Sequence, residues 1–179
     1  MSVLLIGLEE DLGVPVIERL LQEGDIVGVI EEDEGRATRW REMGAHVAGG
    51  AATDFDLVER AAQHARSIVV ADSRFDNSLE VAEAVLTGAR LVPGDRARIV
   101  FIATRPDTGV GEALSTSEFD FIILRVGGSR FWNRARNRLR PELIAEAVNA
   151  ADDLAGAPRL DLDLSDSGSW TILGLPAPS

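Results

Sequence analysis

The feature that most constrains this chain is a regular alternation of apolar runs of strand length with segments whose apolar residues recur at helical spacing. It begins with the run at residues 2–7 and the helical segment at 14–24, and it continues to a helical segment at 141–156. Strands that are rich in Val, Ile and Leu throughout are typical of a parallel sheet covered on both faces. We therefore predict a doubly wound α/β domain of the Rossmann type, three layers deep, with at least five parallel strands and Gly7 at the end of a central one.

The last part of the chain has a different pattern. Leu alternates with Asp from Leu160 to Leu164, a turn follows at 165–169, and apolar residues resume at Trp170. This pattern predicts a strand followed by a hairpin partner. We expect one domain, with its Rossmann-type part at residues 1–159 and a C-terminal strand or hairpin extension and tail at 160–179.

Composition excludes several functions. The net charge is −12, which opposes binding to nucleic acid or to an anionic membrane. No apolar run reaches the length of a membrane span, and no signal peptide is visible, so we expect a cytoplasmic protein. Cysteine is absent, and the two histidines, His46 and His64, fall in different predicted elements, which argues against a metal site.

Two further absences bear on catalysis. The chain contains no Tyr, and all 18 of its basic residues are Arg, so it contains no Lys either. This excludes a Schiff-base lysine, the lysine of a phosphate-binding loop, and a Tyr–Lys acid/base pair.

The order and spacing of several segments resemble the atypical short-chain dehydrogenase/reductases, specifically the NmrA-like NAD(P)-binding proteins. The stretch "VLLIG…LG…VIERLLQEGDIVGVI" has the spacing of their first strand, glycine-rich turn and first helix. Residues 44–70 look like their third strand, third helix and fourth strand, and "ALSTSEFDFIILRVGG" is similar to their "ALxxSGLDxTILRPGG". The resemblance covers most of residues 2–165 and implies a Rossmann fold with a dinucleotide site.

The chain departs from that family at the positions that matter for function. Glu10 stands where the family's turn G-x-x-G-x-x-G has its middle glycine, between Gly7 and Gly13. Ala51 replaces an aspartate that the resemblance places near the adenine, and Val126 replaces a proline. The connection between the fifth and sixth strands is so short that the helix carrying the family's Tyr-x-x-x-Lys pair is expected to be shortened or lost.

The glycine-rich turn carries three carboxylates, Glu9, Glu10 and Asp11. A helix N-terminus attracts a pyrophosphate through its dipole and N–H groups, whereas a carboxylate about 4 Å from a phosphate repels it by about 1 kcal/mol in water. Three interpretations stay open: the acids cap the helix, they take the place of the phosphate, or they point to solvent while the backbone still binds a cofactor.

Other candidate cofactor residues lie at the expected carboxyl ends of strands. Glu31 and Glu32 follow the second strand, where an acid can accept a hydrogen bond from a ribose 2′-hydroxyl, so NAD is favoured over NADP if a dinucleotide binds. Arg36 opposes this preference because it can reach a phosphate, and a solvated acidic loop is the alternative. Asp72 ends the fourth strand and Thr104 the fifth, where relatives often have an active-site hydroxyl; capping a turn is the alternative role for Thr104.

An arginine-rich segment follows the sixth strand. It runs from residue 125 to 140, contains no acid, and includes Arg125, Arg130, Phe131, Trp132, Arg134, Arg136, Arg138 and Arg140. Arginines with aromatics suit a phosphate or carboxylate ligand, or a protein interface such as that of a homodimer. Salt bridges to the protein's own acids are the alternative. We take Arg125, Arg130, Phe131 and Trp132 as candidate substrate or partner contacts.

These observations favour a non-catalytic protein that binds a ligand or nucleotide, or has a regulatory role, with no certain cofactor and NAD if any. Two alternatives remain open. One is an NAD-dependent oxidoreductase or epimerase with an unusual active site, and the other is a structural or interaction module that uses segment 125–140.

Overall fold

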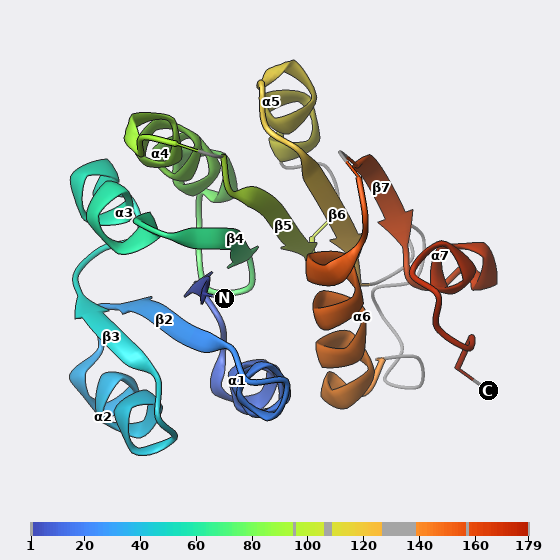
Figure 1. Cartoon of the computed structure of the whole chain (residues 1–179), viewed down its shortest axis with the longest axis horizontal. Coiled ribbons are helices and arrows are strands. Elements are labelled where there is room, and N and C mark those ends of the chain that lie inside the picture. Colours follow the sequence, from blue (N-terminus) through green and yellow to red (C-terminus); the bar gives the residue numbers. More distant parts are fainter. Residues whose placement is uncertain (1, 95, 106–108, 127–138, 157, 179) are drawn as a thin grey trace.

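The computed structural model describes residues 2–94, 96–105, 109–126, 139–156 and 158–178. In this part of the chain seven parallel strands form one sheet of order β3-β2-β1-β4-β5-β6-β7 (Figure 1). The strands are β1 (Ser2–Ile6), β2 (Ile26–Glu31), β3 (His46–Gly49), β4 (Ala65–Ala71), β5 (Arg98–Ala103), β6 (Phe121–Arg125) and β7 (Arg159–Asp163). The predicted parallel Rossmann-type sheet is confirmed, and β1, which Gly7 follows, lies within it between β2 and β4.

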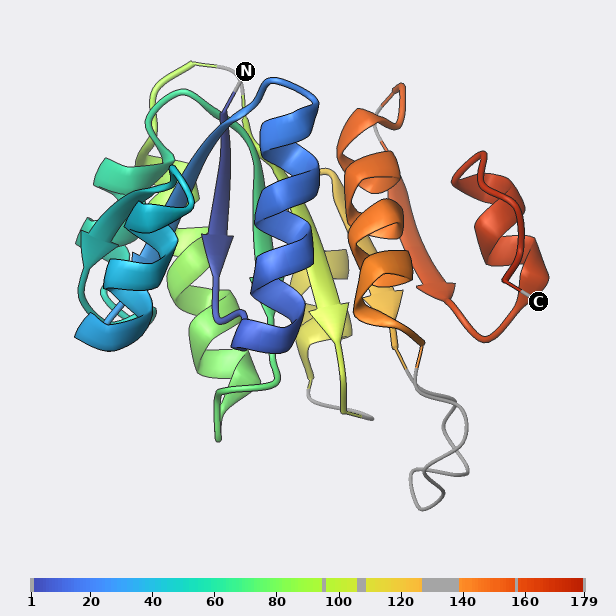
Figure 2. The same cartoon turned by 90° about the horizontal axis from the view of Figure 1, so that it is seen from below.

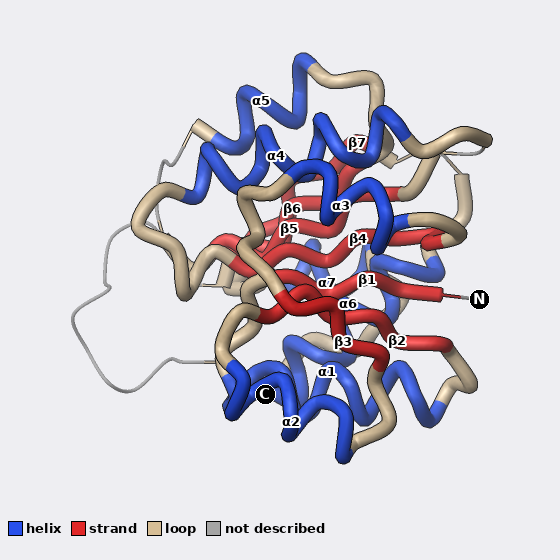
Figure 3. Tube along the Cα trace, turned by 90° about the vertical axis from the view of Figure 1, so that its left-hand side faces the viewer, coloured by secondary structure: helices blue, strands red, loops and turns tan. Residues whose placement is uncertain are grey.

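Helices cover both faces of the sheet (Figure 3). The described helices are α1 (Glu10–Gln22), α2 (Glu34–Glu42), α3 (Phe55–Ala62), α4 (Ser78–Leu91), α5 (Val110–Thr116), α6 (Pro141–Asp153) and α7 (Ser167–Ile172). One core contains side chains of α1, α2, α6 and α7, and the other contains side chains of α3, α4 and α5. The three layers expected from the alternation are therefore present.

Alternate residues of each central strand enter opposite cores. In β1, Val3 and Leu5 face α1 and α6, whereas Leu4 and Ile6 face α3 and α4, and all four side chains are at most 1% exposed. Because both faces are covered, neither set can be polar. This explains why the strands are continuous apolar runs rather than alternating ones.

The C-terminal region differs from the expectation. The predicted strand exists as β7, but it pairs in parallel with β6, and the hairpin is not formed because residues 167–172 are the helix α7. Trp170 and Leu173 are buried three residues apart, which is helical spacing, and the Trp170 Nε1 donates to the Leu164 carbonyl oxygen at 2.9 Å. One turn of helix buries both side chains, which a strand of alternating faces cannot do.

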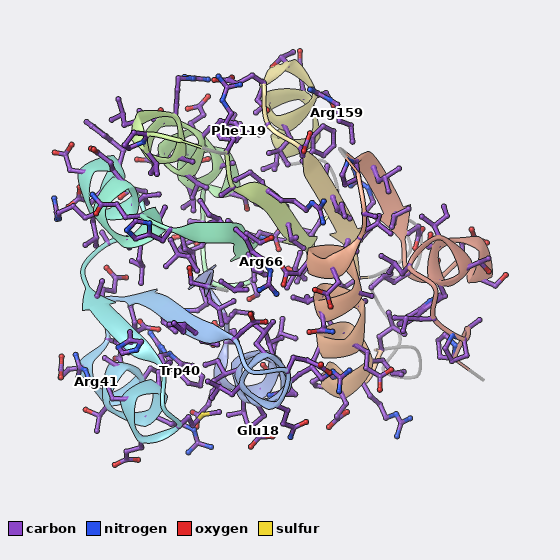
Figure 4. The ribbon with its side chains drawn as sticks, in the orientation of Figure 1. Glu18, Trp40, Arg41, Arg66, Phe119 and Arg159 are labelled. Atoms are coloured by element: carbon purple, nitrogen blue, oxygen red, sulfur yellow. The ribbon has the colours of Figure 1, made fainter. Side chains whose placement is uncertain are left out.

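The connection between β5 and β6 carries the short helix α5 of seven residues. Arg159 of β7, labelled beside α5 in Figure 4, donates to the carbonyl oxygens of Ser115 at 2.6 Å and Ser117 at 2.9 Å. The expected shortening of this helix is thus observed, and a neighbouring strand fixes its C-terminal end. No helix within the described ranges is long and apolar enough to cross a membrane.

Candidate functional site

The carboxyl ends of the strands lie together at one edge of the sheet (Figure 2). Strand order reverses at β1, because β2 and β3 lie on one side of it and β4 to β7 on the other. In open α/β sheets, ligands bind outside the carboxyl ends of the strands at such a switch point. The candidate site is therefore the region where β1 and β4 end.

Gly7 forms the turn after β1 with a φ of +78°, a left-handed conformation that favours glycine. A Cβ atom here would lie 2.7 Å from Cζ of Phe75, and it would also clash with Cε2 of that ring and with the carbonyl oxygen of Ala71. Gly13, the last glycine of the turn, faces Trp40 of α2, whose Cη2 would lie 2.7 Å from a Cβ. Both glycines are needed here for contacts within the protein itself.

The three acids of the turn do not act as side-chain caps. Helix α1 starts after Glu9, and the Glu9 side chain makes no capping hydrogen bond, so the capping interpretation is wrong for the N-cap residue. Glu10 is exposed, and its Oε1 lies 2.7 Å from Nε of Arg39 of α2. Oε1 of Glu9 lies 3.9 Å from Nε of Arg74. Asp11 is exposed. Arginines of the chain thus neutralise part of the acidic charge at this helix terminus.

Glu31, at the end of β2, is buried with only 3% of its surface exposed. Its carboxylate accepts hydrogen bonds from Arg36 Nε at 3.1 Å and Nη2 at 3.2 Å, and from Arg74 Nη1 at 2.6 Å and Nη2 at 3.0 Å. The backbone N–H of Asp33 adds another bond at 3.0 Å. Such bidentate, charge-assisted bonds are the strong class of hydrogen bond.

Burial by itself raises the pKa of Glu31, but the hydrogen bonds from Arg36, Arg74 and the Asp33 backbone outweigh it and lower the pKa to about 2. The same pairing raises the pKa of Arg36. Glu31 is therefore ionised at neutral pH. It is an acceptor that two arginines already use.

Asp72 and Thr104 are joined at the ends of β4 and β5. The Thr104 backbone N–H and its hydroxyl donate to Oδ1 of Asp72 at 2.8 Å and 2.5 Å. Asp72 is fully buried, and its other oxygen, Oδ2, has no hydrogen-bond partner among the described residues. A buried acceptor without a donor is costly, so this oxygen marks a position where a donor is needed.

Arg105, the residue after Thr104, binds the loop that follows β4. One of its terminal nitrogens donates to the carbonyl oxygens of Asp72 and Phe75 and to the Ser78 hydroxyl. The loop is further tightened by the Phe75 N–H, which donates to the Asp72 carbonyl oxygen at 3.3 Å. Residues 72–77, which we name the closing loop, thus fold onto the carboxyl edge.

Arg125 ends β6 and pairs with Asp161 of β7. Its Nε donates to Oδ1 and its Nη2 to Oδ2 of Asp161, each at 2.6 Å. The pair lies at a hollow of about 330 Å³ beside α5, whose wall includes Gly111, Glu112 and Ser115. The other predicted contacts, Arg130, Phe131 and Trp132, lie outside the described residues, as do Arg134, Arg136 and Arg138. Arg140 is exposed at the N-cap of α6.

The structure brings together four of the predicted cofactor residues, Gly7, Glu31, Asp72 and Thr104. Glu10, Glu32 and Ala51 are exposed around them, and Ala51 follows Gly50, whose N–H donates to the Glu31 carbonyl oxygen at 3.2 Å.

Sequence reasoning missed Arg74, Phe75 and Arg105. Their only signal was position, since they directly follow the strand ends at Asp72 and Thr104.

The arrangement does not fit a dinucleotide in this conformation. Phe75 fills the space at Gly7, and Arg74 occupies the Glu31 carboxylate that a ribose would use. Among the residues that the structure describes, no group of three or more His, Cys, Asp or Glu is placed to hold a metal ion.

Comparison with known proteins gives a family and a fold. The model of the TrkA-N domain matches residues 3–124, which is more than half of the chain. No curated protein matches the chain.

Among solved structures, ChuY, an anaerobillin reductase from Escherichia coli O157:H7, superposes with a TM-score of 0.74 at 18% identity, over 91% of this chain and 96% of that one. The triphenylmethane reductase of a Citrobacter species, complexed with NADP(H), has a TM-score of 0.69 at 15% identity, over 90% of this chain and 69% of its own. A putative NAD-dependent epimerase/dehydratase from Bacillus halodurans has a TM-score of 0.67 at 15% identity, over 90% of this chain and 92% of its own. At these identities the likeness shows the Rossmann-type fold.

Proposed function

Because the chain belongs to the TrkA-N domain family, we propose that it is a Rossmann-fold protein that binds a nucleotide or another small ligand and acts as a regulator rather than as a reductase. Within the Rossmann-type proteins, we place it beside the atypical, NmrA-like short-chain dehydrogenase/reductases as a member without their catalytic pair. The observation that carries this proposal is the carboxyl edge itself, which holds no Tyr or Lys because the whole chain has neither.

The geometry supports the loss of chemistry in a second way. The connection where the resembling family carries its Tyr-x-x-x-Lys pair is the seven-residue helix α5, fixed at its end by Arg159. The general acid/base step that such a pair provides contributes about 10²–10⁴ in rate. The segment therefore lacks the residues for that role.

The ligand that the site best suits is NAD among the dinucleotides. Glu31 is ionised at the end of β2, where an acid can accept from a free 2′-hydroxyl, although Arg36 and Arg74 pair with it. The exposed Glu32 beside it adds the negative charge that repels a 2′-phosphate. The names of the structural neighbours, which include an NAD-dependent epimerase/dehydratase and a reductase with NADP(H), support a nucleotide ligand. We also propose that segment 125–140 provides a partner contact, most simply in a homodimer, which light scattering tests.

The test combines turnover and binding on the purified protein. NADH or NADPH is incubated with a panel of carbonyl substrates, and binding of NAD, NADH, NADP and NADPH is measured by calorimetry. We expect saturable binding of NAD and no oxidation above that of a heat-denatured control. Steady, stoichiometric oxidation of either reduced cofactor would contradict the regulatory role.

A specific observation favours one alternative, an oxidoreductase or epimerase with an unusual site. Asp72 and Thr104 are joined by a 2.5 Å hydrogen bond, and Asp72 Oδ2 is buried without a described partner. This carboxylate and hydroxyl are the acid/base pair that the carboxyl edge still offers. If turnover is found, Asp72→Asn and Thr104→Val should each abolish it, whereas Glu112→Gln on α5 should not.

A further inference from the structure

We propose that the closing loop, residues 72–77, is an internal competitor that occupies the nucleotide position, so that a nucleotide with a free ribose 2′-hydroxyl binds only when this loop moves away. The inference rests on the proposed function, because it assigns the regulation of the same site. It follows from three contacts that the loop makes with three different strand ends.

The first contact is that of Phe75 with Gly7. In Rossmann domains the first glycine of this turn makes the tight bend beside which the pyrophosphate binds. Here the Phe75 ring packs against that glycine, since its Cζ would lie 2.7 Å from a Cβ at Gly7 and its Cε2 closer still. The ring is only partly exposed and packs against the core that α3 and α4 share with β1. An aromatic side chain thus lies against the turn beside which a ligand would bind.

The second contact is that of Arg74 with the acids. Its guanidinium donates twice to Glu31, at 2.6 Å and 3.0 Å, and its Nε lies 3.9 Å from Glu9. It therefore bridges the end of β2 and the turn after β1. A ribose diol donates to a carboxylate at the end of β2 in the same bidentate way, so the diol and Arg74 compete for one acceptor. After Arg74 leaves, Glu31 still keeps Arg36 and the Asp33 N–H as partners.

The third contact is that of Arg105, which lies just after β5 and binds the loop. It donates to the Asp72 and Phe75 carbonyl oxygens at the beginning and middle of the loop, and to Ser78 at the start of α4. At the end of the loop, the Asn77 side chain caps α4 by accepting from the Glu80 N–H at 3.2 Å. The loop is thus fixed at both ends, and Arg105 joins it to the end of β5 as Arg74 joins it to the end of β2.

The chemistry of the uncovered site selects the ligand. Loop movement frees one side of the Glu31 carboxylate and uncovers the Gly7 turn. Glu31 stays paired with Arg36, and the exposed carboxylate of Glu32 beside it repels a 2′-phosphate. NAD and ADP-ribose, which carry an adenosine ribose with a free 2′-hydroxyl, are therefore the matching probes, and NADP is the mismatched one.

The experiment uses the full chain and two variants that open the loop by different routes. Arg105→Ala removes the hydrogen bonds from Arg105 to the loop. Phe75→Ala removes the ring that packs against Gly7 and leaves the Arg105 hydrogen bonds in place. Arg90→Ala is the matched control, because Arg90 forms an exposed pair with Glu118 and lies in the last turn of α4, at the opposite end of that helix from the loop. Circular dichroism and urea unfolding first establish which variants are folded.

Two readouts separate loop opening from ligand binding. Without ligand, trypsin cleavage after Arg74 is followed by mass spectrometry in wild type, Arg105→Ala and Arg90→Ala. With ligand, the affinities for NAD, ADP-ribose and NADP are measured by calorimetry in all variants. A site that is open about a tenth of the time binds about tenfold more weakly than one that is always open.

We expect cleavage after Arg74 to rise about tenfold in Arg105→Ala, and the affinity for NAD and ADP-ribose to rise about tenfold in both opening variants, with NADP weaker throughout. Arg90→Ala should match the wild type in both. Tight binding of NAD to the wild type that neither variant improves would overturn the competition and leave nucleotide binding intact. Faster cleavage with no binding of NAD to any variant would overturn nucleotide binding, and the competition with it. If Arg105→Ala does not fold, the affinities of Phe75→Ala decide alone.

Discussion

Arginines have different partners at the two ends of the parallel strands. Where the strands begin, which we call the amino edge, Arg66 of β4 pairs with Asp25 and Asp152. Here Arg98 of β5 also donates to the carbonyl oxygens of Ala151 and Asp152, both at 2.8 Å. These contacts join β2, β4, β5 and the end of α6. At the carboxyl edge, Arg74 and Arg105 instead join a loop to the strand ends.

The difference lies in what the arginines hold. The partners at the amino edge belong to, or directly border, strands and a helix that pack in the core, so their pairing fixes the fold. The partners at the carboxyl edge include loop residues 72–77, which fold over the switch point where ligands bind in this fold. The same bidentate chemistry thus stabilises the fold at one edge and closes a site at the other.

The largest expected effect breaks the amino-edge cluster. Asp152 has a fully buried side chain and accepts from Arg66 Nε at 3.0 Å. Asp152→Ala leaves the guanidinium with one buried partner fewer, and removing one member of a buried pair costs about 3–5 kcal/mol of unfolding free energy. Urea unfolding at pH 7 measures it.

Glu34→Ala is the matched control, because Glu34 pairs with Arg41 while its side chain is 80% exposed. Glu34→Ala should lower the free energy of unfolding by no more than about 0.5 kcal/mol. Equal losses in the two variants would show that the amino-edge cluster does not hold the fold.

The next effect is the pH dependence of the stability that Glu31 contributes at the carboxyl edge. The pKa of Glu31 is lowered to about 2, so its contribution to stability is complete above its unfolded pKa, near 4.5, and is lost as the pH falls toward 2. We expect the wild type to lose about 2 kcal/mol more than Glu31→Gln between pH 5 and pH 2.5. Unfolding by urea at a series of pH values measures the difference.

The Asp25 pKa is also lowered, chiefly by its hydrogen bond from Arg66, so acid weakens the amino edge in both proteins. That loss is common to the wild type and Glu31→Gln and cancels in the comparison. Parallel stability curves for the two proteins would mean that Glu31 and its arginines add nothing to the folded state.

The smallest expected effect on stability concerns the acids of the glycine turn. The variant Glu9→Gln, Glu10→Gln, Asp11→Asn removes three negative charges at the start of α1. Because Glu9 makes no side-chain cap, the losses are the interaction with the helix dipole and the exposed contacts of Glu10 with Arg39 and of Glu9 with Arg74, and the cost should stay near or below about 1 kcal/mol. The affinity for NAD should rise severalfold in calorimetry, and the rise should shrink in high salt, which screens exposed charges. An unchanged affinity would show that the acids do not oppose the phosphate.

Much of the fold could be predicted because its causes are local. Continuous apolar strands, helical spacing and turn residues predicted the parallel sheet, and the short connection between the fifth and sixth strands, compared with the resembling family, predicted that its helix is shortened or lost. The hairpin after residue 164 was wrong because alternation of Leu and Asp gives a half-buried strand but does not say which strand it pairs with. Burial of Trp170 and Leu173 on one side of a helix decided that question through tertiary packing.

The site was predicted less completely. Gly7, Glu31, Asp72 and Thr104 could be named because parallel strands end at a common edge. Arg74, Phe75 and Arg105 could not, because a loop side chain takes its position from long-range contacts, such as that between Phe75 and the Gly7 turn. The sequence pattern of a loop carries no period from which such contacts can be inferred.

The most direct test of the closed carboxyl edge is hydrogen exchange of the wild type with and without saturating NAD. The Phe75 amide donates to the backbone carbonyl oxygen of Asp72 in the closed loop. The Ile99 amide donates to the backbone carbonyl oxygen of Asp120 near the amino edge. If NAD displaces the loop, a peptide covering residues 72–78 should exchange faster with NAD bound, and one covering residue 99 should not change. Exchange in residues 72–78 that is unchanged or slower at saturating NAD would contradict the account.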